Sequence, residues 1–352
     1  MLPMAGAQKE LLTDLLKEVS RSLYLTLRIL PKSIRPQIGL AYLLARTTDT
    51  IADTEIVSIE QRLKMLQALR ERILGTSSQP LSFGELAQHQ GSPAERVLLE
   101  KSEASLALLQ SQSAIDQKLI REVLDVITSG QELDLKRFGG APSPAKIIAL
   151  QTDAELDDYT YRVAGCVGRF WTRMCLAHRF STARTSAPSF EELGVRFGKG
   201  LQLFNILRDM PADLAKGRCY IPAEKLAAIG LSPEDLLRPE NEPKFRPLYN
   251  HYLDLTESHL AAGWEYTNLI PFGQMRIRLA CAWLILIGLK TIPRLRSENV
   301  LDPRVRIKIP RAEVWRMIRR SVLCYPLPGT WRRMANFRGT SAKAGAPSTG
   351  SA

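Results

Sequence analysis

The stretch Leu201-Gln-Leu-Phe-Asn-Ile-Leu-Arg-Asp-Met-Pro-Ala-Asp213 places polar side chains at helical spacing within an apolar sequence. Three, four and four residues separate the members of this polar set, which are Gln202, Asn205, Asp209 and Asp213. On a helix that spacing stacks them into one stripe, while the apolar side chains between them point elsewhere and predict a buried helix. A buried carboxylate is costly unless it is paired with a cation or bound to a metal ion. The stripe therefore indicates either a metal site or a salt-bridge network with the neighbouring cations, Arg208, Lys216 and Arg218.

A second pair of carboxylates has the same spacing. Asp49 and Asp53 lie four residues apart and follow the apolar run Leu40-Ala-Tyr-Leu-Leu-Ala45. Two such pairs on two mostly apolar helices are interpreted as two walls of one site. Carboxylate oxygens on an open site suit Mg2+ that carries the phosphate or diphosphate of a substrate. Arg46, one turn before Asp49 on the same face, is placed to meet that phosphate.

Pro211 lies between the two aspartates of the first stripe. Proline removes a helix hydrogen bond, and its ring clashes with the backbone one turn back. We therefore expect the helix to kink, or a new turn to begin, at Pro211. The metal geometry is accordingly better defined at Asp209 than at Asp213.

Composition and patterning predict one all-α domain. The 352 residues contain no Ser/Gly linker or repeat before the last twenty or so residues, and no strand-like alternation. Five scattered cysteines without metal-ligand spacing indicate a reducing compartment, with neither disulfides nor zinc. The N-terminus lacks a secretory signal pattern, and the longest apolar run, residues 279–289, is about half as long as a bilayer span. We therefore expect a cytoplasmic protein, either free or bound to a membrane surface.

The acidic motif at residues 49–53, together with Asn-x-x-Arg-Asp-x-x-x-Asp at residues 205–213, resembles the trans-isoprenyl diphosphate synthases that join two prenyl chains head to head. Within that group the chain resembles the squalene and phytoene synthase family over residues 15–295, with its motifs in the family's order. The resemblance implies the isoprenoid synthase fold, a single all-α helical bundle around a central cavity. We assign this domain to residues 8–295.

The resemblance also implies roles for individual residues. The oxygen donors for Mg2+ would be Asp49, Asp53, Asn205, Asp209 and Asp213. The contacts to substrate diphosphate would be Ser20, Arg21, Arg46, Gln202, Asn205, Arg208 and Arg218, of which the first two belong to a Ser-Arg-Ser element. Relatives often carry further acids where this chain has Ala52 and Thr54, so the first motif offers fewer ligands for metal ions.

The segment Tyr159-Thr-Tyr-Arg-Val-Ala-Gly165-Cys-Val-Gly168 predicts a close contact with its backbone. Glycine within a helix costs about 1 kcal/mol relative to alanine, so two of them indicate that a neighbouring helix or a flat ligand packs there. The family has the same pattern, and the resemblance implies that Tyr159 acts at the carbocation, as a base or an electrostatic guide. Phe170 and Trp171 could also steady a cation, although core packing is the favoured interpretation.

The resemblance leaves three products open. Squalene synthases join two farnesyl diphosphates through presqualene diphosphate, a cyclopropyl intermediate, and reduce it with NADPH. Phytoene synthases join two geranylgeranyl diphosphates without a reductant, and a third group stops at presqualene diphosphate. The Ser20 element, the first acidic motif and residues 279–289 followed by 304–314 look most like bacterial squalene synthases. We therefore expect a monomeric squalene synthase, with no residues assigned to NADPH.

The C-terminal part of the chain is strongly basic. Residues 290–338 carry thirteen Lys/Arg and three Asp/Glu, in a chain whose net charge is +12. Such a segment indicates a membrane surface or nucleic acid as partner; nucleic acid is disfavoured because the paired aspartates would repel its phosphates. We expect residues 296–325 to be a basic extension and residues 326–352 to be disordered.

A helix drawn over Arg311–Val322 is amphipathic. Its apolar arc comprises Val314, Trp315, Met317, Ile318 and Val322, opposite several arginines. That pattern is typical of a helix lying on the anionic face of a membrane. The alternative is a helix that packs on the bundle and leaves its arginines in solvent.

Overall fold

A computed structural model describes residues 10–20, 24–139, 146–180, 186–335 and 337. The first half of the chain forms η1 (Glu10–Leu15), α2 (Leu16–Ser20), α3 (Tyr24–Ile29), α4 (Arg35–Asp53), α5 (Ile59–Leu74), α6 (Gly84–Gln88), α7 (Pro93–Glu100), α8 (Ser102–Gln110) and α9 (Ala114–Phe138). The second half forms α10 (Asp153–Thr160), η3 (Tyr161–Gly165), α11 (Cys166–His178), α12 (Ala187–Ala215), α13 (Ala223–Ala228), η4 (Pro233–Leu237), η5 (Pro239–Asn241), α14 (Glu242–Leu269), α15 (Met275–Ser297), α16 (Arg311–Cys324) and α17 (Pro328–Arg332). Within the described residues, the sheet consists of two short parallel strands, β1 (Ile148–Ala149) and β2 (Arg218–Cys219). The expected all-α fold is confirmed.

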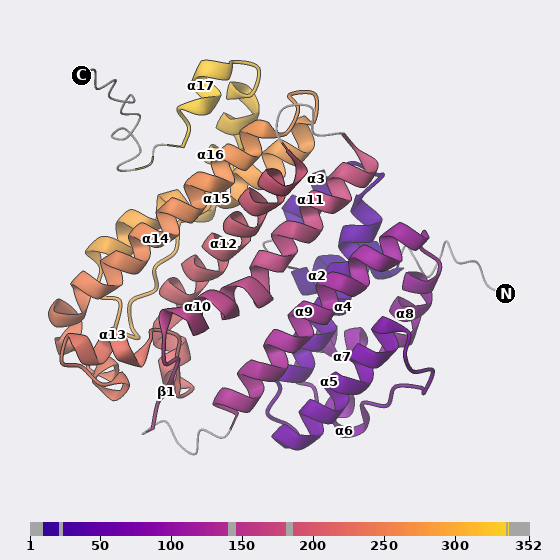
Figure 1. The fold of residues 1–352 in the computed structure, drawn as a ribbon, viewed down its shortest axis with the longest axis horizontal. Helices are drawn as coiled ribbons and strands as arrows, with labels where there is room; N and C mark the ends of the chain where they lie inside the picture. The colour runs from indigo at the N-terminus through magenta and orange to yellow at the C-terminus, as the bar shows by residue number, and fades with distance from the viewer. Residues whose placement is uncertain (1–9, 21–23, 140–145, 181–185, 336, 338–352) are drawn as a thin grey trace, which may run out of the picture.

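The helices pack around a central group formed by α9, α11 and α12 (Figure 1). On one side α4 and α5 pack against α9, and on the other α14 packs against α12 and carries α15 and then α16. One continuous apolar core runs through the bundle, including Leu40, Leu43 and Leu44 of α4, which are completely buried. Asp49 and Asp53, near the end of α4, lie on the opposite face of this helix from those leucines.

The glycines after Tyr159 mark a contact between two helix backbones. A Cβ atom on Gly168 would lie 1.9 Å from the carbonyl oxygen of Gly194, and one on Gly198 would lie 2.1 Å from that of Ala164. Only glycine allows α11 and α12 to approach so closely. The predicted contact was with either a neighbouring helix or a flat ligand, and the structure shows that a neighbouring helix makes it. Residues 161–165 form a single π-helical turn, a feature often found at functional sites.

Helix α12 continues through Pro211 to Ala215, so the expected new turn at the proline is not found. In an ordinary helix the carbonyl of Leu207 would accept a hydrogen bond from the amide of residue 211, which proline lacks. Here it accepts one from the hydroxyl of Tyr249 on α14, at 3.0 Å. The missing donor is therefore replaced from a neighbouring helix.

The basic C-terminal segment is folded against the bundle as far as α17. Met317 and Ile318 of α16 are buried against the body of the protein, and Trp283 Nε1 donates to Ser321 Oγ at 2.9 Å. Trp331 of α17 is also buried; its ring stacks on Trp264 with 5.2 Å between centroids. Residues 328–332, within the segment expected to be disordered, form the helix α17, which Trp331 holds to α14.

Residues 338–352 lie outside the described residues. Among the described helices, none is both long enough and apolar enough to cross a membrane.

Candidate active site

The two carboxylate pairs lie on the same polar pocket, whose volume is about 310 Å3. Asp49 and Asp53 come from the last turn of α4, and Asp209 and Asp213 from the end of α12. The other predicted site residues on this pocket are Tyr159, Gln202, Asn205 and Arg218. The two motifs, more than 150 residues apart in sequence, therefore face each other across one site.

Burial and mutual repulsion disfavour the charged forms of two of these carboxylates. Burial, and then the neighbouring Asp209, raise the pKa of Asp213 to about 7. Burial, and then Asp53, raise the pKa of Asp49 to about 6. A bound cation would relieve both effects by stabilising the ionised carboxylates.

Arginines neutralise the site incompletely. Arg46 pairs with both Asp49 and Glu95 of α7, Arg208 pairs with Asp209, and an Arg218 nitrogen lies 3.8 Å from an oxygen of Asp53. The predicted salt-bridge network thus exists in part. Within the described part of the chain, however, no cation pairs directly with Asp213.

Three predicted diphosphate contacts within the described residues, Ser20, Arg46 and Arg208, do not line this pocket. Ser20 is buried on α2, and its hydroxyl donates to the carbonyl of Leu16. Arg21 lies outside the described residues. Arg46 reaches a second polar pocket, of about 420 Å3, which it shares with Asp53 and Glu95.

Helix α9 contributes acceptors that were not predicted from the sequence. Asp134 accepts a hydrogen bond from the hydroxyl of Tyr220 at 2.9 Å, and burial raises its pKa to about 6. Gln131 lines the same pocket one turn away. The pair Gln131-x-x-Asp134 has helical spacing on a partly apolar helix, the same signal that marks the two aspartate motifs.

Tyr159 is buried between these groups. Its ring stacks on that of Tyr220, with 4.6 Å between centroids and 25° between planes. Burial, followed by the charge of Asp134, raises the pKa of Tyr159 well above its usual value. Its hydroxyl is therefore neutral and can donate a hydrogen bond, but it is poorly suited to act as a phenolate base.

The chemistry of the donors fits Mg2+ that is bound together with a phosphate. The motif side chains that line the pocket and were predicted as metal ligands all offer oxygen: Asp49, Asp53, Asn205, Asp209 and Asp213. The buried atoms Asp134 Oδ1 and Gln131 Oε1 have no hydrogen-bond partner in the described structure. No three acidic, histidine or cysteine side chains among the described residues converge closely enough to hold an ion on their own. Mg2+ commonly uses one or two carboxylates and completes its shell with water and substrate phosphate, so this open arrangement suits it.

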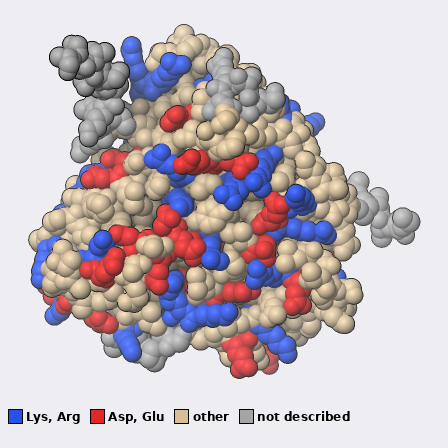
Figure 2. All heavy atoms as spheres, viewed as in Figure 1, with Lys and Arg blue, Asp and Glu red and all other residues tan. Residues whose placement is uncertain are grey.

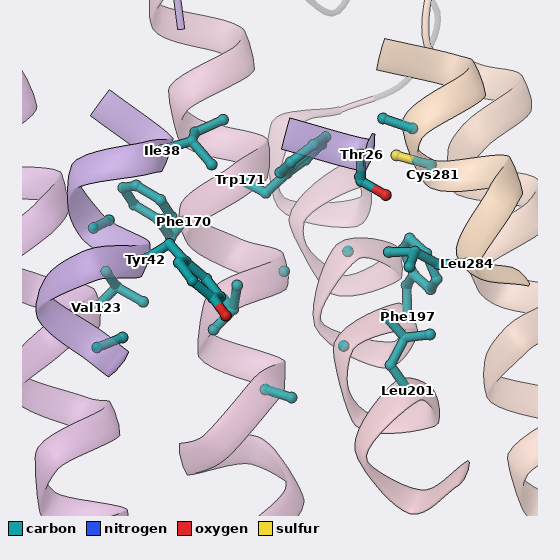
Figure 3. Close-up of a pocket in the computed structure, with 18 of the residues that line it drawn as sticks. Thr26, Ile38, Tyr42, Val123, Phe170, Trp171, Phe197, Leu201, Cys281 and Leu284 are labelled. Atoms are coloured by element: carbon teal, nitrogen blue, oxygen red, sulfur yellow. The ribbon is translucent and has the colours of Figure 1, made fainter. Parts of the chain in front are cut away.

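An apolar cavity of about 280 Å3 follows the polar pocket along α4 and α12. Figure 3 shows Ile38 and Tyr42 of α4 and Phe170 of α11 on one side of it, with Phe197 and Leu201 of α12 and Leu284 of α15 on the other. On α12 the cavity ends at Leu201, and the polar pocket begins at Gln202. Phe170 and Trp171, for which core packing was favoured, line this cavity.

The model of the squalene/phytoene synthase family matches residues 16–313 of the chain. The squalene synthase ERG9 of Saccharomyces cerevisiae is 29% identical over 84% of this chain and 63% of its own length. A presqualene diphosphate synthase of Zymomonas mobilis is 27% identical over 86% of this chain and 90% of its own length. A phytoene synthase of Thermus thermophilus is 38% identical, but over only 46% of this chain and 52% of its own. The chain thus spans less than two thirds of the yeast and Thermus relatives.

Solved structures share the fold. A complex of TcSQS with the ligand E5700 superposes with a TM-score of 0.72 at 19% identity, covering 90% of this chain and 85% of that one. Squalene synthase HpnC from Alicyclobacillus acidocaldarius superposes with a TM-score of 0.60 at 18% identity, covering 84% of this chain and 95% of that one. At these identities the likeness shows the helical fold alone.

Proposed function

The chain belongs to the squalene/phytoene synthase family, whose members are prenyltransferases, and from this we propose that it joins two farnesyl diphosphates head to head to form squalene. One observation carries the proposal: the carboxylate pocket and the apolar cavity follow each other along α4 and α12. A prenyl diphosphate has the same division, with an anionic head and an apolar chain. Its diphosphate would lie between the aspartates and its chain between Tyr42, Phe170 and Leu201.

The proposed site residues have different roles in ionising the first substrate. Asp49, Asp53, Asn205, Asp209 and Asp213 would hold Mg2+, which supplies charge neutralisation to the departing diphosphate. Arg46, Arg208 and Arg218 lie at the edges of the acidic groups and would neutralise the remaining phosphate charge. The apolar cavity excludes water from the allylic cation, so the double bond of the second substrate can attack it. That attack, followed by loss of one proton as the ring closes, forms the cyclopropyl ring of presqualene diphosphate and leaves the first diphosphate as the released product.

We assign Tyr159 the role of electrostatic guide near the cation. Its buried, neutral hydroxyl lies at the boundary of the polar pocket, and the ring of Tyr220 fixes its orientation. The hydrogen bond from Tyr220 to Asp134 orients Tyr220 in turn. Tyr159, Tyr220 and Asp134 thus form a connected series from α10 through the β2 segment to α9.

The second half-reaction distinguishes the possible products. Reduction of presqualene diphosphate by NADPH would give squalene, which is our proposal. Two presqualene diphosphate synthases, from Zymomonas mobilis and Rhodopseudomonas palustris, are among the relatives, so release of the cyclopropyl intermediate is the second candidate. The phytoene alternative requires the longer geranylgeranyl chain to enter the same cavity.

Labelled substrates test the proposal directly. The purified full-length protein would be incubated with Mg2+ and either farnesyl or geranylgeranyl diphosphate, with and without NADPH. We expect presqualene diphosphate from farnesyl diphosphate alone and squalene when NADPH is added. Presqualene diphosphate in both cases would identify the second candidate, and phytoene would identify the third. Absence of every head-to-head product would contradict the proposal.

We also propose that the protein is a monomer that binds the anionic cytoplasmic surface of a membrane through α16. The structure divides the predicted apolar arc: Met317 and Ile318 face the bundle, whereas Trp315 is 49% exposed. Val322 and Leu323, the latter 75% exposed, add further apolar surface to α16. Arg311, Arg316, Arg319 and Arg320 on the same helix are exposed as well. Exposed apolar and basic side chains on one helix suit a headgroup layer, and squalene is too apolar to leave into water.

Truncation at Pro310 would expose the buried face of α15, so point variants are the better test. Figure 2 shows Lys and Arg side chains at the end of the molecule formed by α17. The point variants described next retain all of these basic side chains. Trp315→Ser combined with Leu323→Ser should reduce sedimentation with anionic liposomes, while Leu255→Ser on α14, also an exposed leucine, should not. Unchanged sedimentation of the double variant would rule out α16 as the contact.

A further inference from the structure

The last turn of α12 depends on a hydrogen bond from outside the helix. Pro211 has no amide hydrogen, so the carbonyl of Leu207 lacks its ordinary helical donor. Leu207 is 1% exposed, so water cannot readily supply another. The hydroxyl of Tyr249 donates to this carbonyl at 3.0 Å, and both groups are buried. Two residues beyond the proline is Asp213, one of the four motif aspartates.

Tyr249 is held rigidly by its own helix and by α15. It is completely buried, its ring centroid lies 5.7 Å from that of Phe245, and the guanidinium carbon of Arg246 lies 5.3 Å from the ring centroid. Arg246 is fixed by donating to the carbonyl of Leu295 at 2.7 Å. The tyrosine hydroxyl is therefore positioned before any substrate arrives.

The orientation of Asp213 has little other support. Within the described structure its carboxylate has no direct cation partner, unlike Asp209, which pairs with Arg208. Its direction into the pocket is therefore set by the backbone of the last turn. That backbone would lose a buried hydrogen bond without the Tyr249 hydroxyl, and the carbonyl of Leu207 would have to turn toward another donor.

We propose that Tyr249 is a positioning residue for the second carboxylate pair: its hydroxyl replaces the amide that Pro211 lacks and keeps Asp213 one turn beyond Asp209, facing the polar pocket. This inference rests on the proposed function, in which that pair binds a metal–diphosphate group. It also explains how a proline is tolerated in the middle of an acidic motif.

The test is a cycle of variants, Tyr249→Phe, Pro211→Ala and the two combined. Phenylalanine keeps the ring and removes only the donor, while alanine restores the amide that can pair with Leu207. Tyr252→Phe is the matched control, because Tyr252 is a buried tyrosine on the same helix whose hydroxyl donates to Asp153, away from α12. Two readouts are compared: the Kd of inorganic pyrophosphate at a fixed Mg2+ concentration, and amide hydrogen exchange at residues 212–215.

We expect Tyr249→Phe to raise the pyrophosphate Kd about fivefold or more, as loss of one buried hydrogen bond predicts, and to speed exchange at residues 212–215. Pro211→Ala in that background should restore both values, and Tyr252→Phe should change neither. Wild-type values in Tyr249→Phe would overturn the proposal. The proposal would also be overturned if adding Pro211→Ala to Tyr249→Phe restored neither value. The hydroxyl would then act by some route other than the Leu207 carbonyl.

The two readouts separate this inference from the proposed function. If Asp209→Asn binds pyrophosphate as well as the wild type does, the metal–diphosphate role of the second pair fails. In that case hydrogen exchange at residues 212–215 still tests the role of the Tyr249 hydroxyl, since this measurement requires no metal or substrate. Unchanged exchange in Tyr249→Phe would show that the hydroxyl does not hold the last turn.

Discussion

The two carboxylate pairs have the same spacing but different structural support. Asp49 and Asp53 end α4, and Arg46 of the same helix, itself paired with Glu95, contacts Asp49. Asp209 and Asp213 lie near the end of a 29-residue helix that contains a proline, and Asp213 is without a direct cation partner among the described residues. The first pair is therefore oriented by side chains of its own neighbourhood, whereas Asp213 of the second pair depends on a hydrogen bond from α14. Identical motif spacing does not imply identical preorganisation.

Replacement of one aspartate of each pair, both proposed metal ligands, is expected to have the largest effect. Asp49→Asn and Asp209→Asn should each lower turnover by about 10³-fold or more, because a catalytic metal contributes several kcal/mol of charge stabilisation. Steady-state kinetics with farnesyl diphosphate and circular dichroism would measure activity and folding together. Near-normal turnover in both folded variants would exclude these pairs as the metal site.

Tyr159→Phe should have the second largest effect on the rate. It removes one hydroxyl and keeps the ring that stacks on Tyr220, so we expect the first half-reaction to slow by about 100-fold, as for loss of one preorganised donor. Single-turnover formation of presqualene diphosphate measures this step alone. Tyr252→Phe, a buried tyrosine outside the pocket, is the control. The assigned role is wrong if the intermediate forms at the wild-type rate.

The shape of the cavity should affect substrate choice more modestly. Trp171→Ala enlarges the apolar cavity, and Ala45→Leu fills part of it. We expect the ratio of kcat/KM for geranylgeranyl over farnesyl diphosphate to rise about tenfold in the first variant and to fall in the second, as differences of a few methylene groups allow. Competition between the two labelled substrates measures the ratio. An unchanged ratio in both variants would show that the prenyl chain of the substrate binds outside this cavity.

The raised pKa values of Asp49 and Asp213 predict a small effect on stability in the absence of metal. Their ordinary value is 3.8, and the folded protein raises them to about 6 and about 7, so the folded state binds more protons than the unfolded state between those values. The free energy of unfolding should therefore fall as pH rises from about 4 to about 7. Asp213→Asn should flatten this dependence, and Asp254→Asn, outside the pocket, should not. Urea unfolding at several pH values provides the measurement; an unchanged slope in Asp213→Asn would contradict the assigned shift.

The helical fold and both acidic motifs could be predicted because they rest on local periodicity. Four-residue spacing within apolar helices placed Asp49, Asp53, Asp209 and Asp213 on two walls, and the structure brings them to one pocket. Asp134 and Tyr220 were missed because their proximity to Tyr159 arises from three segments distant in sequence. The glycines at 165 and 168 predicted a close contact, but only the packed structure identified α12 as the partner.

The sequence by itself therefore determined the fold class and, through the resemblance of its motifs, the family, and it predicted a site of oxygen donors, since helical periodicity and residue type are local properties. The tertiary structure decided how much of that chemistry is preorganised. It showed that α12 continues through Pro211, where the hydroxyl of Tyr249 on α14 donates to the carbonyl of Leu207, and that the hydroxyl of Ser20 donates to its own helix and does not line the pocket. It also showed that α16 buries Met317 and Ile318 of its apolar arc and exposes Trp315 and Val322. Each of these outcomes depends on which helix packs beside which, and on buried hydrogen bonds between residues far apart in the chain.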